Sequence, residues 1–154
     1  MKSNQLNCFF SLLLLITSLL AMVASAQSLG FSGKAQRVYT PSSGRVERKA
    51  ILDAMRNKVK EMHDLDVVFV VKSMKVRDGW AWVHTMPRSE DGSSRYENFS
   101  ALLRKVDGRW RVVEIPCTEP DNSECIDSSD YFSKLLDRFP GLPLSILPAA
   151  TLER

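Results

Sequence analysis

The sequence offers few side chains that could carry out chemistry, and the best candidate is a histidine. His84 lies just after two tryptophans in the stretch WAWVHTM. A histidine titrates near neutral pH and can act as a general base when it is buried beside a substrate. Asp66 or Tyr96 could complete such a set. A strand-end histidine held by a local hydrogen bond explains His84 more simply, so we predict no catalytic site and keep His84, Asp66 and Tyr96 as candidates.

The cysteines favour a structural role over a chemical one. Cys117 and Cys125 are separated by TEPDNSE, and the chain has two histidines, both far from them in sequence. A metal site needs more ligands than this pair provides. In an oxidising compartment the pair is most simply a disulfide, which would contribute about 2–3 kcal/mol for so short a loop. Glycine-rich phosphate loops and nucleophilic-serine motifs are absent from the sequence, and we expect no metal and no cofactor.

The start of the chain has the pattern of a secretory signal peptide. Lys2 precedes an apolar run at residues 9–23, and small residues follow at Ala24 and Ala26. This order of a basic start, an apolar segment and small residues predicts cleavage between Ala26 and Gln27. A retained membrane anchor is the alternative, since a slightly longer apolar segment can span a bilayer. We therefore expect residues 1–26 to be removed, with export to the periplasm or outside the cell and no stable membrane insertion afterwards.

Length and charge limit the function further. Of 154 residues, removal of 26 would leave about 128, enough for one ordinary domain with its own core. The formal net charge is only +3, and basic residues alternate with acidic ones, as in RVERKAILDAMRNKVKEMHD. That alternation is typical of a solvated helix face. We expect no binding to nucleic acid, which would require a basic block.

Sequence periodicity predicts an α+β fold: a helix packed on a four-stranded antiparallel meander, followed by a C-terminal helix. Residues 27–41 resemble a flexible lead closed by Pro41, and residues 42–62 have helical spacing, with Ser42 or Ser43 as the cap. The apolar stripe of this helix comprises Val46, Ala50, Ile51, Ala54, Met55, Val59 and Met62.

Four strands are expected at residues 67–76, 80–86, 98–106 and 109–115. Asp78-Gly79 and Asp107-Gly108 are hairpin signals between the first and last pairs, and the polar residues 87–97 form a loop. Residues 128–139 form the second helix, which Pro140 ends. Residues 42–140 are thus predicted to be a single domain, and the proline-containing tail, residues 141–154, should lie across it.

Alternation along the strands predicts a sheet that is apolar on both faces. Trp80, Trp82, His84 and Met86 share one face, whereas Ala81, Val83 and Thr85 share the other. The first helix can cover one face, and three occupants could cover the second: the C-terminal helix and tail, another copy of the protein, or a ligand. The first occupant needs no partner and is the one we favour. The candidate ligand or interface residues are Trp80, Trp82, Met86 and Trp110.

The stretches VVFVV, GWAWV and ALLRKVDGRWRVVEI resemble a group of small exported bacterial proteins built on a helix and a curved antiparallel sheet. That plan is similar to the cystatin-like and nuclear-transport-factor-like superfamily, over residues 42–115. The resemblance implies a fold that hosts isomerases, dehydratases, inhibitors and binding modules, so it leaves function open. Enzymes of the superfamily generally have more helix ahead of the sheet than this chain has, which argues against a deep catalytic cavity.

Three functions of different classes are compatible with these features. The first is an exported non-catalytic binding or interaction domain of unknown ligand, which meets a protein partner or a second copy of itself through the sheet. The second is a small isomerase- or dehydratase-type enzyme with a pocket on the sheet face. The third is a cell-envelope accessory protein or hydrolase inhibitor, which would use residues 87–97 or the cysteine loop as its contact.

Overall fold

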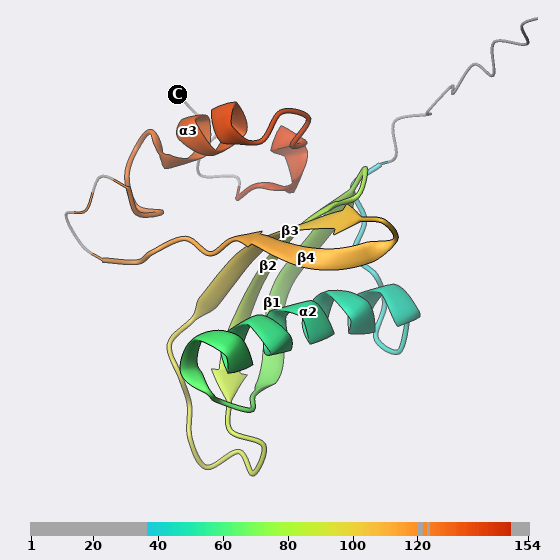
Figure 1. Ribbon diagram of the computed structural model, residues 1–154, viewed down its shortest axis with the longest axis vertical. Helices are drawn as coiled ribbons and strands as arrows, with labels where there is room; N and C mark the ends of the chain where they lie inside the picture. The colour runs from blue at the N-terminus through green and yellow to red at the C-terminus, as the bar shows by residue number, and fades with distance from the viewer. Residues whose placement is uncertain (1–36, 120–121, 123, 149–154) are drawn as a thin grey trace, which may run out of the picture. The chain divides into compact units, whose positions relative to one another are not determined.

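The structure is a computed structural model, and it describes residues 37–119, 122 and 124–148. The predicted signal peptide at residues 1–26 lies outside the described residues, as do residues 149–154 of the tail. The elements in order are α2 (Val46–His63), β1 (Val68–Arg77), β2 (Trp80–Arg88), β3 (Phe99–Val106), β4 (Arg109–Glu114), α3 (Tyr131–Arg138) and the 3-10 helix η1 (Leu144–Ile146) (Figure 1). This order confirms the predicted α+β fold class.

The four strands form one antiparallel sheet in the order β1-β2-β3-β4. Asp78 and Gly79 both have positive φ, at 49° and 76°, and Asp107 and Gly108 have nearly the same values, 50° and 76°. Two consecutive residues with positive φ match the right-handed twist of the strands that they connect. Both predicted hairpins are therefore present, and each predicted strand lies within two residues of its observed bounds.

Helix α2 begins later than the sequence predicts, and no serine caps it. The residue before the helix is Arg45, which makes no side-chain cap hydrogen bond. Its backbone N–H donates to the Ser42 carbonyl in a turn that Gly44 completes with a φ of 82°. The predicted cap at Ser42 or Ser43 is therefore wrong, because this turn holds both serines outside the helix.

The buried stripe of α2 is narrower than the predicted one. Ile51, Met55 and Val59 are buried at four-residue spacing. Val46 is 86% exposed and Met62 is 47% exposed. Five residues before Ile51, Val46 lies about 140° around the helix from it and so turns away from the sheet. The placement of Val46 and Met62 in the apolar stripe was thus wrong.

The sheet is covered on both faces, as the two-sided apolar pattern predicted. On the first face α2 packs against a cluster that includes Ala81, Val83, Leu103 and Trp110. On the second face residues 125–148, here called the C-terminal segment, pack against Trp80, Trp82 and Leu102 (Figure 1). The buried side chains that it contributes to this cluster are Tyr131, Phe132, Leu135, Leu142, Ile146 and Leu147. The expectation that the chain's own C-terminal helix and tail cover the tryptophans is confirmed.

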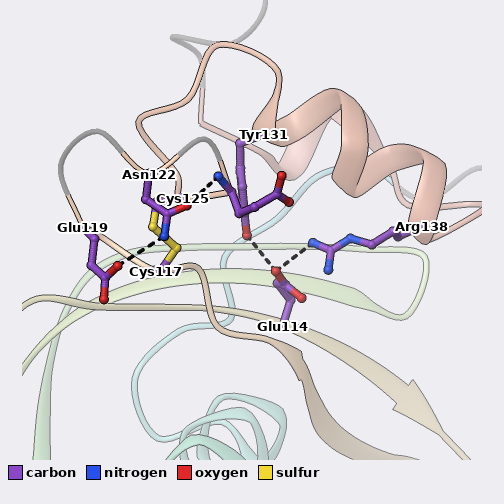
Figure 2. The surroundings of a disulfide bond; sticks show 8 residues. Glu114, Cys117, Glu119, Asn122, Cys125, Tyr131 and Arg138 are labelled. Carbon is purple, nitrogen blue, oxygen red and sulfur yellow. Dashed lines mark hydrogen bonds and ion pairs between the residues drawn. A yellow bond between two sulfur atoms is a disulfide. The ribbon is translucent and has the colours of Figure 1, made fainter.

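An ion-paired contact fixes α3 to the edge strand β4. The Tyr131 hydroxyl donates to Glu114 Oε1 at 3.1 Å, and Arg138 Nη2 donates to the same oxygen at 2.8 Å (Figure 2). Burial and the adjacent Glu114 carboxylate raise the pKa of the Tyr131 phenol, so it remains a donor at neutral pH. Because the two donors come from the first and last residues of α3, the helix is held at both ends.

The predicted disulfide is present between the sheet and the C-terminal segment. Cys117 and Cys125 are bonded, and the Ile126 N–H donates to the Cys117 carbonyl at 3.1 Å across the same loop. Figure 2 shows the bond beside the Glu114 contact. The covalent closure therefore brings the chain back toward the second face immediately after β4 ends.

Residues 37–41, which precede α2, lie along β1. Tyr39 forms an antiparallel bridge with Val76, and its hydroxyl donates to Glu47 Oε2 at 2.8 Å. Pro41 is buried. Residues 37–41 thus join the sheet edge to the start of α2. Within the described ranges, no helix combines the length and the apolar character needed to cross a bilayer.

Candidate functional site

The C-terminal segment covers the second face incompletely and leaves a pocket of about 390 Å³. This volume is at the lower end of the range of small-molecule sites. Strand residues of the sheet line it: Ser73, Lys75, Trp82, His84 and Ser100. The remaining lining comes from residues before β3, after β4 and in the C-terminal segment: Asn98, Pro116, Thr118, Ile126, Ile146 and Pro148. We call it the His84 pocket.

A row of three polar side chains crosses the sheet in this pocket. In the strand register Ser73 is opposite His84, and His84 is opposite Ser100. His84 Nδ1 lies 2.9 Å from Ser100 Oγ, so one of the two donates to the other according to the histidine tautomer. The sequence suggested a strand-end histidine with a local hydrogen bond, whereas His84 lies in the middle of β2, its contact reaches across to β3, and its half-buried ring borders a cavity.

A bulge in β1 places Ser73 and Lys75 in the pocket. The register of β1 against β2 shifts between Val71 and Ser73, which leaves one additional residue on β1. Phe69 and Val71 pack on the first face before the shift, and Met74 packs there after it. Without the bulge, strict alternation would direct Ser73 and Lys75 into the core under α2. The bulge therefore turns both polar side chains to the second face.

Lys75 and Trp82 form the row next to the polar one. They are opposite each other in the register, and Trp82 is in turn opposite Leu102. Trp82 is 3% exposed and packs at a tilt against Phe132, with 5.6 Å between ring centroids. The Lys75 ammonium donates to the Leu147 carbonyl at 3.3 Å. The pocket thus has an apolar floor with an ammonium at its side.

The three candidate catalytic residues do not come together. The Asp66 carboxylate pairs with Lys60 Nζ at 2.9 Å on the protein surface. Tyr96 lines an adjoining hollow of about 350 Å³, which shares Ser100 with the His84 pocket, and packs against the cluster on the first face. Neither residue lines the His84 pocket. The structure therefore provides His84 with no acidic or phenolic partner from this set.

The candidate ligand or interface residues are also divided. Trp80 is 4% exposed and stacks edge-on against Phe139 of the C-terminal segment. Met86 is half-buried at the end of β2, and Trp110 is buried on the first face with α2. Of these four residues, only Trp82 lines the His84 pocket. Trp80 and Trp82 pack in the cluster on the second face, and the small part of Trp82 that stays exposed borders the His84 pocket.

His84 and Ser100 are the residue types of a catalytic dyad, but the groups and the backbone turn that activate such a dyad are not found among the described residues around them. In serine hydrolases a third group orients the histidine, and the serine stands on a sharp turn that exposes its hydroxyl. Ser100 lies within the extended strand β3, and no carboxylate is among the described residues that line the pocket. The part of the chain that the structure describes also holds no cluster of side chains suited to a metal ion. The arrangement fits hydrogen bonding to a ligand better than nucleophilic attack.

A larger hollow of about 830 Å³ lies beside the start of α2 and is a weaker candidate. Its one acidic lining residue is already paired: Glu47 accepts from the Tyr39 hydroxyl and lies 3.8 Å from Lys105 Nζ. A ligand there would have to compete with these pairs. The His84 pocket brings a histidine, an ammonium and hydroxyl groups from three strands together beside apolar side chains, which makes it the better candidate site.

Sequence reasoning found His84 and Trp82 but missed Ser73, Lys75 and Ser100 as their neighbours. A signal for Ser73 and Lys75 was present in the sequence. The apolar residues of the first strand that pack on the first face change from odd positions, at Phe69 and Val71, to even positions, at Met74 and Val76. Such a change of phase indicates a bulge.

Comparison of the chain with protein-family models, with curated proteins and with solved structures finds no match.

Proposed function

We propose that this protein is an exported, non-catalytic binding domain that holds a small ligand in the His84 pocket. One observation carries the proposal: a cavity of about 390 Å³ in which polar side chains from three strands converge beside the apolar surface of Trp82. Small-molecule sites combine a mostly apolar wall with a few placed polar groups in this way. Export is supported by the signal-like start of the sequence and by the Cys117–Cys125 bond, which is typical of oxidising compartments.

The non-catalytic part of the proposal is supported by the environment of His84. Acid–base catalysis by a histidine commonly relies on a carboxylate that orients the ring, and no carboxylate is among the described residues that line the pocket. Within the described lining, His84 has a serine hydroxyl as its hydrogen-bond partner and Lys75 as the other titratable neighbour. This set can donate and accept hydrogen bonds to a bound molecule without a proton relay. The resemblance to a superfamily that includes binding modules agrees with the same proposal.

Native mass spectrometry of the protein isolated from the cells that produce it would test binding. We expect a mass adduct that Ser100→Leu abolishes, because the larger side chain occupies the pocket. Ser133→Leu is the matched control, since Ser133 is exposed on α3, and it should retain the adduct. A bare chain for the unsubstituted protein, or equal adducts in all three forms, would contradict ligand binding at this site.

The same protein should be treated with a fluorophosphonate, which forms a covalent bond to activated serines. We expect no covalent adduct on Ser100. Stoichiometric labelling of Ser100 would show that the His84–Ser100 pair is a working nucleophile, and the protein would then be an enzyme.

A further inference from the structure

The charge balance of the His84 pocket indicates which chemical class of ligand it takes, and this inference rests on the proposed binding function. Among the described lining residues Lys75 is the one lysine or arginine, and no aspartate or glutamate is present. The other polar groups are the His84 ring, the Asn98 amide and the hydroxyls of Ser73, Ser100 and Thr118. The site is therefore positive and rich in donors.

The Lys75 ammonium has no carboxylate partner among the described residues. Its one hydrogen bond there is to the Leu147 carbonyl, at 3.3 Å. An ammonium has three N–H donors, so two remain for another acceptor. Lys75 is half-buried beside Trp82 and Ile146. An anion in the pocket could therefore pair with its ammonium group.

We propose that the ligand is a small organic monocarboxylate with a compact apolar body. The carboxylate binds the Lys75 ammonium and accepts hydrogen bonds from the adjacent hydroxyls, and the body contacts Trp82 and Ile126. A single ammonium balances one negative charge, whereas a phosphate monoester carries nearly two near neutral pH. The volume of about 390 Å³ limits the body to about one or two rings.

Three probes of nearly the same shape test the charge: phenylacetate, phenylacetamide and phenethylamine. Each is titrated into the isotope-labelled natural chain, and binding is followed by NMR through the amide signals of His84, Ser100 and Trp82. We expect phenylacetate to shift these signals and to bind at least about tenfold more tightly than phenylacetamide, because charge-assisted hydrogen bonds are the stronger ones. Equal affinities, or preference for the amine, would overturn the ligand class and leave the pocket function standing. No shift with any probe would overturn both.

Substitutions on β1 identify the residue responsible. Lys75→Gln should weaken phenylacetate binding about tenfold and leave phenylacetamide unchanged, whereas Lys75→Arg should retain most of the difference between the two probes. Lys72→Gln removes the same charge from the bulge and does not alter the pocket lining, so it should bind both probes as the unsubstituted chain does. If Lys72→Gln weakens phenylacetate as much as Lys75→Gln, general charge attraction explains the binding, and the assignment to Lys75 is wrong.

Discussion

Replacement of Leu135 by alanine tests whether α3 is held on the sheet by packing. Leu135 is fully buried on the second face, in a helix of eight residues. So short a helix is not stable alone in water, so contacts with the rest of the domain must hold it in place. Alanine is the better helix former. Any loss of stability on Leu135→Ala must therefore come from lost packing and not from helix propensity.

The expected loss follows from the buried surface. The substitution removes the three outer carbons of the side chain, which at about 0.8 kcal/mol per carbon gives about 2.4 kcal/mol. The cavity left beneath α3 adds to this, and measured leucine-to-alanine changes in cores are about 2–5 kcal/mol. We therefore expect the free energy of unfolding to fall by about 3–4 kcal/mol.

Urea unfolding followed by tryptophan fluorescence measures this loss, because Trp80 and Trp82 lie beneath the same segment. Leu144→Ala is the matched control: it removes the same atoms from η1, where the side chain is 45% exposed, and it should cost under about 1 kcal/mol. Equal losses for the two variants would refute the packing of the C-terminal segment on the second face.

Three further predictions concern charge, ionisation and covalent closure. Arg104 and Arg111 are directly opposite each other on β3 and β4, so Arg111→Glu should stabilise the fold by about 0.2–1 kcal/mol. Thermal unfolding measures this gain. An Arg111→Gln variant measured in the same way shows how much of the gain comes from removing the repulsion between the two arginines. Burial, with the adjacent Glu47 carboxylate, raises the pKa of Tyr39 from 10.0 to about 12, and the pKa of Tyr131 is raised as well. The native state therefore retains these phenolic protons more strongly than the unfolded state, so stability should fall as pH rises from about 10 towards 12. Near-ultraviolet absorbance should show Tyr39 and Tyr131 ionising above the usual range of a tyrosine, and ionisation of these two near pH 10 would contradict the buried contacts. Reduction of the disulfide should lower the free energy of unfolding by about 2–3 kcal/mol while far-ultraviolet circular dichroism stays native, and loss of the native spectrum would mean that the bond is required for folding itself.

Local sequence signals predicted the elements of this fold well. Asp78-Gly79 and Asp107-Gly108 specify their turns through their own backbone preferences, so these hairpins could be located without any tertiary information. The start of α2 was misplaced because a serine near a helix start can serve either as a cap or as part of a preceding turn. Here Gly44 and Arg45 form a turn with Ser42, so the serines precede the helix.

The candidate site was only partly predictable. The alternation of Trp82 and His84 placed them on one face, but Ser100 becomes a partner of His84 only through the register of β2 against β3. Lys75 joins them only because the bulge shifts the phase of β1 by one residue. Asp66 and Tyr96 lie near His84 in sequence, yet the turn after α2 and the loop before β3 lead them away from it.

The sequence by itself determined the order of the helices α2 and α3 and of the four strands, the two hairpins, the two apolar faces of the sheet and the pairing of Cys117 with Cys125. Each of these depends on side-chain period, turn chemistry or composition, which act over a few residues. Only the tertiary structure decided that the chain covers its own tryptophans and that a pocket remains beside His84. Both outcomes depend on how far the C-terminal segment extends over the sheet, which packing between residues far apart in sequence determines.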